Sequence, residues 1–558
     1  MKQNTTLFRS TLLGCALVLG IGQLKADNVT LTTSDLPIVI IQTQAAINAD
    51  AKVAGTMKII DNGSGQTNSV SDAPNAFDGH IGIKLRGESS LNFNQKKYTV
   101  ETWDALGNDS VVSIFDMPAE SDWVLLAPYN DVSMVRDVFA YGLWNQMGHW
   151  GPRTRMCEVV VNGEYMGVYA FCERIKRDKN RVDISKLKPE DISGRDVTGG
   201  YIVRIDAYDQ DDVTFQSKVM GIQKSMWGWG GSQTQEAPVT WTIYYPKKED
   251  LAAEQMAYIQ NYVDSAELAI QSADFTDPVK GYSQFIDVAS FVDYFIHTEL
   301  SLNADGFKRS AYYYKEKDKK DGTRGKLFAG PVWDYNLAYG NCSFCNANNV
   351  TSWVYEGCET NPTPKMWKRL LEDKSFRDAV KTRYTQLRQD ILSNESINAF
   401  LDSYAAMLDQ AKDRQLTKYK EVLKSSSWWD YSPTAMFAAY RVSSYAEEIQ
   451  TVKEWFAKRL AFLDSNLPGE YVDNTAIRAL HFLDGRVAID QHSIHVESPL
   501  PLQRIVATNV LGATLSVVSL DGTQTSASLD LSSLPTGLCV VVCYATDGSM
   551  FSRTVTLR

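Results

Sequence analysis

The spacing of apolar residues divides the chain into a strand-rich first part, a helical middle and a strand-rich end. Over residues 37–103, short β-branched runs alternate with turns rich in Asn, Gly, Ser and Asp, which is typical of strands. Asn162-Gly163 separates two further β-rich runs and predicts a tight hairpin. A similar run at 200–206 predicts another strand.

Helices are expected in the second half. Apolar residues recur at spacings of three and four over 249–272, over 287–302 and over most of 364–467. After Pro468-Gly469 the chain returns to short runs separated by turns, which indicates a separate small β-sandwich over 476–558. The predicted fold class is therefore α+β, followed by an all-β domain.

The first 26 residues predict a signal peptide. Lys2 and Arg9 precede an apolar stretch at 11–22, and Ala26 offers a small residue before a cleavage point. A second interpretation takes Cys15 as the lipid-modified cysteine of a lipoprotein signal. No later run is long and apolar enough to cross a membrane.

Charge and cysteine content narrow the possible functions. The chain has 56 basic and 67 acidic residues, a net charge of -11, which excludes nonspecific binding to nucleic-acid phosphates as a main function.

Export makes the seven cysteines after Cys15 candidates for disulfides. Around Cys342, Cys345 and Cys358 a local disulfide is favoured over a zinc site, which lacks a nearby fourth ligand. Cys539 and Cys543 lie four apart in a strand, about 13 Å when extended, so they are expected to be separate core thiols.

Residues 287–341 carry the most informative pattern. The helix at 287–302 should leave Asp305 in the following loop, and strands at 310–315 and 326–333 should form a hairpin that ends at Asp334. Antiparallel pairing would bring Asp305, Ser310, Asp334 and Asn336 to one end of that hairpin. Two carboxylates with short oxygen donors are suited to holding a hard divalent cation against phosphate oxygens.

The interval between Asp305 and Ser310 equals that between the catalytic Asp and metal-binding Asn of protein kinases, and Asp334 would then match the Asp of the DFG motif. Loop aspartates that cap helices and form turns give the same spacing, so both interpretations remain open on spacing alone.

Wider blocks extend this pattern. They are LRGESS (85–90), KKY (96–98), DW (122–123), ND (130–131), RD (136–137), VNGEY (161–165), GVY (167–169), ERIKR (173–177), NRV (180–182), NAD (303–305), GPVWD (330–334) and GN (340–341). In these blocks and their order the sequence resembles the CotH kinase family, named for the spore coat protein H of spore-forming bacteria, over about residues 35–465. The resemblance implies an atypical protein-kinase-like fold over 76–470, with a β-rich segment at 27–75 packed on it. It also implies phosphorylation of protein with ATP and Mg, Mn being a possible replacement.

The resemblance also implies site residues. Asp305 matches the catalytic-loop Asp and Asp334 the metal-binding Asp, while Lys96 or the adjacent Lys97 matches the phosphate-binding lysine. Glu173 would be its acidic partner. The loop with Arg86, Ser89 and Ser90 would offer further donors to phosphate.

Two positions depart from the family pattern. Ser310 stands where Asn is usual and Asn336 where Asp is common, so magnesium should be held less tightly.

The C-terminal domain is similar to the sorting domain of the type IX secretion system of some Gram-negative bacteria, in blocks at 509–512, 534–538 and 552–557. This implies passage through the periplasm to the cell surface or medium, with the type IX machinery as a partner. An ordinary β-sandwich binding module is the alternative. Two functions stay open for the whole protein: an exported kinase with a protein acceptor, and a surface adhesion or scaffold protein that uses the kinase-like fold as a binding platform.

Overall fold

The computed structural model describes residues 29–224, 234–423, 440, 442–472, 485–490, 493–509, 514–530, 537–546 and 550–557. The expected signal peptide with Cys15, and parts of the blocks at 509–512 and 534–538, lie outside these ranges. Within them the fold is mixed α and β, as the sequence predicts.

Strands of the first part close into a barrel. They are β2 (Ile38–Thr43), β3 (Val53–Ile60), β5 (Phe77–Arg86), β6 (Lys97–Trp103), β7 (Asp122–Leu126), β8 (Thr154–Val161) and β9 (Glu164–Glu173). A parallel β2–β8 pair completes the ring. Alternating inward residues such as Ile81, Ile83 and Val100 are fully buried and fill the interior.

The structure confirms the predicted hairpin in this region but not the boundary expected at residue 75. Asn162 and Gly163, with φ of 51° and 81°, form the turn between β8 and β9, so the predicted hairpin is confirmed. β2 and β3 precede residue 76 but belong to the same barrel as β5 to β9. The barrel therefore continues across the boundary expected at residue 75, and 27–75 is not a separate layer.

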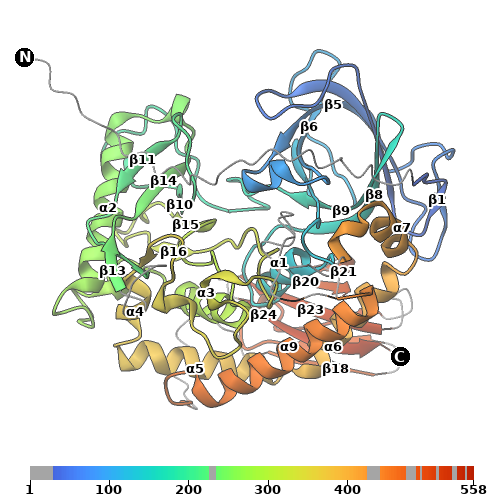
Figure 1. The fold of residues 1–558 in the computed structure, drawn as a ribbon. Coiled ribbons are helices and arrows are strands. Elements are labelled where there is room, and N and C mark those ends of the chain that lie inside the picture. The colour runs from blue at the N-terminus through green and yellow to red at the C-terminus, as the bar shows by residue number, and fades with distance from the viewer. Residues whose placement is uncertain are drawn as a thin grey trace, which may run out of the picture.

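A second body is built on a five-stranded sheet. Its order is β11 (Val213–Gln216), β14 (Thr240–Tyr245), β10 (Tyr201–Ile205), β15 (Ala311–Lys315) and β16 (Leu327–Ala329). Figure 1 shows this sheet with α2 (Ala253–Gln271) on the opposite side of the view from the barrel. Short strands complete the described part: β1 (Thr33–Ser34), β4 (Asn68–Ser69), β12 (Gly221–Lys224), β13 (Thr234–Ala237) and β17 (Thr363–Pro364).

Helices surround one continuous apolar core. They are α1 (Arg136–Gln146), α3 (Val288–Ser301), α4 (Met366–Leu370), α5 (Lys374–Arg388), α6 (Asn394–Met407), α7 (Ala411–Lys418) and α9 (Tyr445–Asn466). The helices predicted over 249–272, 287–302 and 364–467 are confirmed. Within the described ranges, none of the helices combines the length and apolar character needed to span a membrane.

The C-terminal residues form two small sheets around their own core. One contains β18 (Arg486–Ile489), β19 (Ser493–Glu497) and β22 (Ser526–Asp530), and the other contains β20 (Leu502–Asn509), β21 (Thr514–Ser519), β23 (Gly537–Ala545) and β24 (Met550–Leu557). Cys539 and Cys543 are buried thiols, as predicted. The domain contacts the end of α1, where the Ser552 hydroxyl donates to the Gln146 carbonyl at 3.0 Å.

Candidate active site

The loop after α3 carries Asp305. Asp287 caps the start of α3 by accepting from the Ser290 N–H at 2.9 Å, and the helix ends as predicted before the left-handed residue Leu302. The Asn303 side chain then accepts from the Asp305 N–H at 3.2 Å. The sequence at the helix end therefore fixes the backbone of Asp305.

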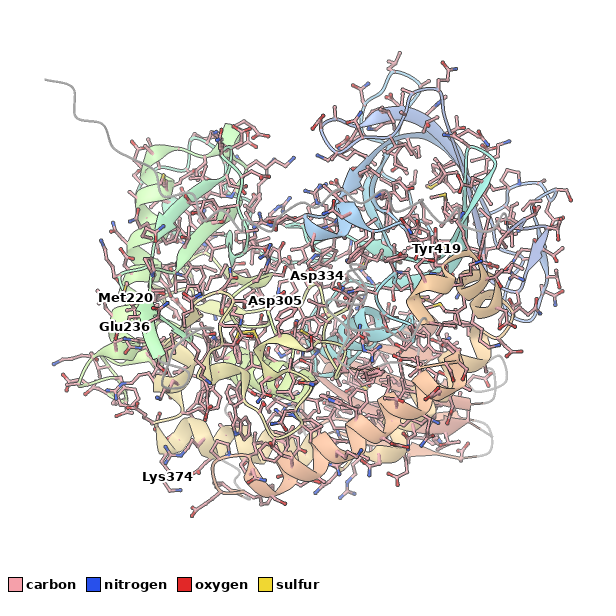
Figure 2. All side chains as sticks on the ribbon, in the orientation of Figure 1. Met220, Glu236, Asp305, Asp334, Lys374 and Tyr419 are labelled. Carbon is pink, nitrogen blue, oxygen red and sulfur yellow. A yellow bond between two sulfur atoms is a disulfide. The ribbon has the colours of Figure 1, made fainter. Side chains whose placement is uncertain are left out.

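Asp334 reaches the same place through the β15–β16 hairpin. Tyr313 pairs with Ala329 across the two antiparallel strands, so the start of β15 lies beside the end of β16. Figure 2 shows Asp305 and Asp334 near each other in the middle of the molecule. The Asp334 N–H donates to the Tyr141 hydroxyl at 3.1 Å, which ties this loop to α1. Of the four residues predicted to meet at one end of the hairpin, Asp305, Ser310 and Asp334 lie there, whereas Asn336 is hydrogen-bonded to Asn130 in the loop before α1.

The adjacent lysines have different partners. The Lys97 ammonium lies 3.3 Å from an Asp334 carboxylate oxygen, and its side chain is only 9% exposed. The Lys96 ammonium instead donates to the Leu91 carbonyl at 2.7 Å. Lys97 is the first residue of β6, whereas Lys96 precedes the strand, and the two side chains reach different partners. The geometry therefore places Lys97, and not Lys96, beside Asp334.

Glu173 has partners other than the expected lysine. Its fully buried carboxylate accepts from Arg153 Nε and Nη2 at 2.7 Å each, and Arg181 Nε lies 3.5 Å away. A buried carboxylate needs such compensation, and two guanidinium groups supply it. Glu173 therefore stabilises the barrel end and does not contact Lys96.

An acidic residue near Lys97 comes from α1. Asp137, in the first turn of that helix, accepts from the Tyr335 N–H at 2.5 Å. Burial raises the pKa of Asp137 to about 6, with Lys97 opposing the shift and Asp334 adding to it. Sequence reasoning gave Asp137 no role, although it lies in the RD block at 136–137.

Asp206 is a further carboxylate that the sequence did not indicate. It follows β10, and its Oδ1 lies 3.4 Å from the Ser310 hydroxyl, while Oδ2 accepts from Arg204 Nη1 at 3.1 Å. Burial raises the pKa of Asp206, and Arg204 opposes that shift. A carboxylate thus lies beside the position where a kinase has its second metal-binding side chain.

The remaining predicted residues lie around this centre. The Asn336 amide donates to Asn130 Oδ1 at 2.8 Å, which ties it to the loop before α1. Arg86, opposite Lys97 in the barrel ladder, places its guanidinium 5.0 Å from the ring centre of Trp333. Ser89 is exposed and Ser90 buried in the short 3₁₀ helix η1 (Ser89–Asn92) that follows Arg86.

The electrostatics of the site suit a proton acceptor and a cation. Burial raises the pKa of Asp305, Lys308 and Arg309 oppose the shift, and Asp334 and Asp206 reinforce it. Among the residues that the structure describes, the carboxylates of Asp305, Asp334 and Asp206 do not all lie within 4.8 Å of one another, so these three side chains alone do not form a complete metal site. Kinases hold magnesium with few side chains together with nucleotide phosphates, and the hard oxygen donors here fit that arrangement.

A disulfide lies beside the loop that carries Asp305. Cys345 is bonded to Cys358, so the expected local disulfide is present, and Cys342 is a buried thiol. The bonded sulfurs are not available as zinc ligands. The Lys308 ammonium lies 3.2 Å from the Cys345 sulfur, and burial lowers the pKa of Lys308 to about 8.

Comparison with known proteins assigns the chain to a family. None of the curated proteins compared with the chain matches it. The model of the family described as CotH kinase protein matches residues 83–463, more than half of the chain. That match runs from β5 to α9 and includes Lys97, Asp305 and Asp334. The chain therefore belongs to the CotH kinase family.

Proposed function

We propose that the protein is an exported atypical protein kinase that transfers the γ-phosphoryl group of ATP, as its magnesium complex, to a hydroxyl group of a protein. The observation that carries this proposal is the position of Asp305 and Asp334 at one end of the β15–β16 hairpin, with the Lys97 ammonium 3.3 Å from Asp334. Magnesium, or manganese in its place, would neutralise phosphate charge when bound.

Each residue has a distinct role in this proposal. Asp334 would hold the metal, with Ser310 and Asp206 beside it, and Lys97 would bind phosphate oxygens. Asp305 would accept or orient the proton of the acceptor hydroxyl, and its raised pKa suits a proton acceptor better than an unperturbed carboxylate would. Asp137 would keep the Asp334 loop in position through the Tyr335 N–H.

Export and sorting belong to the same proposal. The N-terminal signal would direct the chain to the periplasm, and the C-terminal sandwich would pass it to the type IX machinery, which places it on the surface or in the medium. The acceptor would then be an exported protein.

The mature chain, 27–558, tests the proposed activity. Nucleotide affinity and phosphoryl transfer are measured side by side with labelled ATP and magnesium or manganese. Asp305→Asn should bind ATP within a fewfold of wild type yet lower transfer by roughly 100-fold or more, because proton acceptance acts only along the reaction. Asp334→Asn should lower both quantities, since the metal contact serves both.

Other outcomes would reassign the protein. Wild type that binds ATP but transfers nothing, with every metal and candidate acceptor, would be a pseudokinase, and Ser310→Asn with Asn336→Asp would be the first substitutions to restore transfer. Wild type without nucleotide affinity would favour the adhesion or scaffold function.

A further inference from the structure

Besides Lys97–Asp334, a second ion pair crosses the site from one body of the fold to the other. A guanidinium nitrogen of Arg309 contacts a carboxylate oxygen of Glu88, 221 residues away in sequence. Glu88 lies in the loop between β5 and β6 of the barrel, and Arg309 lies in the loop between α3 and β15. The pair therefore links the loop expected to cover the phosphates to the loop that carries Asp305.

Arg309 is anchored on the catalytic loop by its backbone. Its N–H donates to the Asp305 carbonyl at 2.8 Å, so the residue keeps its place next to Asp305 whatever its side chain contacts. The guanidinium is close enough to Asp305 to oppose the rise of that residue's pKa. A positively charged side chain, on a backbone that is hydrogen-bonded to Asp305, thus lies beside the proposed reacting centre.

The other cations of the site are already engaged. Lys97 is buried against Asp334, and Arg86 lies over the Trp333 ring. The Glu88 side chain is 71% exposed and that of Arg309 32% exposed, so their pair faces solvent. Exposed ion pairs contribute little stability and are screened by salt, which makes this partner of Arg309 easy to displace.

We propose that Arg309 is a phosphate-binding residue and that Glu88 occupies its guanidinium until the phosphates of a nucleoside triphosphate displace the carboxylate. The planar guanidinium forms paired hydrogen bonds with carboxylate and phosphate alike, and the more highly charged triphosphate is the stronger partner. Glu88 then acts as an internal competitor that sets nucleotide affinity. This inference rests on the proposed function, because it assumes that the site binds a nucleotide.

The test uses the mature chain and a non-hydrolysable ATP analogue with magnesium, followed by calorimetry. Arg309→Ala should weaken binding of the analogue roughly tenfold or more, because charge-assisted hydrogen bonds to phosphate are lost. Glu88→Gln should tighten binding by about two- to fivefold, the range expected from an exposed ion pair. In the Arg309→Ala background, Glu88→Gln should not change the affinity for the analogue further, since the guanidinium for which Glu88 competes is then absent.

A matched control comes from an ion-paired glutamate of similar exposure elsewhere in the barrel. Glu164, whose side chain is 69% exposed, pairs with Lys418 at 2.8 Å. Glu164→Gln should leave nucleotide affinity unchanged, and thermal unfolding of every variant checks that it is folded.

Three results would overturn the proposal. If Glu88→Gln binds the ATP analogue as wild type does, or more weakly, then Glu88 does not compete with the phosphates, and the ion pair only connects the two bodies of the fold. Unchanged affinity in Arg309→Ala would remove Arg309 from the phosphate site. Both results, obtained with normal wild-type affinity, leave the proposed function standing. Wild type that binds no nucleotide would instead overturn the proposed function itself, and this inference with it.

Discussion

Lys96 and Lys97 are adjacent in sequence, but only Lys97 belongs to a strand of the barrel. Lys97, the first residue of β6, points to Asp334, whereas Lys96 is held by the Leu91 carbonyl in the preceding loop. The distinction matters because family resemblance alone leaves the two positions equivalent. At the residue scale, the direction of one side chain decides which ammonium group can meet a phosphate.

The two lysines give a matched pair of substitutions. Lys97→Met should weaken ATP–magnesium binding roughly tenfold or more, since a buried charge opposite the phosphates is lost. Lys96→Met removes one hydrogen bond to a loop carbonyl and should change affinity less than about twofold, at a stability cost of about 1 kcal/mol. Calorimetry on both variants decides the assignment. A larger effect from Lys96→Met would return the role to that residue.

At the element scale, α2 packs on the five-stranded sheet through a buried acid. Glu267 is 4% exposed, and its two oxygens accept from the Ser217 hydroxyl at 2.6 Å and from Trp241 Nε1 at 3.1 Å. Burial raises the pKa of Glu267 to about 7, against hydrogen bonds from Ser217 and Trp241 that lower it. No cationic partner compensates a negative charge among these contacts.

This acid should make stability depend on pH. The folded pKa of about 7 exceeds the ordinary value of 4.5, so the folded state keeps a proton that the unfolded state releases between these values. The free energy of unfolding should therefore fall as pH rises through this window, by roughly 3 kcal/mol at most. In Glu267→Gln the amide oxygen can still accept from Trp241 Nε1, and the amide NH2 can donate to the Ser217 hydroxyl, which then acts as acceptor. This variant should not show the fall, and it should therefore be more stable than wild type at pH 8.

Urea unfolding at pH 4.5 and pH 8 measures the effect, with the exposed Glu254→Gln in the same helix as the control. An equal pH slope in wild type and Glu267→Gln would show that Glu267 is charged in the folded state.

At the scale of the whole molecule, the C-terminal sandwich has its own core but touches the helix that supports Asp334. Phe139 and Leu143 of α1 line a cavity together with Leu538 and Val540 of β23. The polypeptide of the preceding body stays attached to α5 through Val472, whose N–H donates to the Thr382 hydroxyl at 3.0 Å. The helical part of the chain therefore extends at least to residue 472, slightly beyond the boundary expected at 470.

Deleting residues 473–558 should leave a cooperatively folded protein, because the two cores are distinct. Its melting temperature should fall by a few degrees, as the apolar side of α1 loses its cover. Under the proposed sorting function the shortened protein should also remain in the periplasm, which fractionation with immunodetection measures. Normal amounts at the surface or in the medium would reassign the sandwich as a binding module.

The sequence by itself determined the features that depend on neighbouring residues. The turn at Asn162-Gly163, the helix from Val288 to Ser301 and the hairpin that joins Asp305 to Asp334 all follow from local propensity and short-range pairing. These local elements are enough to place the two principal carboxylates at one end of the hairpin.

Only the tertiary structure decided the contacts between distant segments. It placed Asp206 beside Ser310, gave Glu173 two arginines in place of a lysine, and paired Cys345 with Cys358 while Cys342 stayed a thiol. Local propensity determines which residues lie on a strand or in a loop. The direction in which a side chain points, and the residue that it contacts, depend instead on strand register and on how separate elements pack.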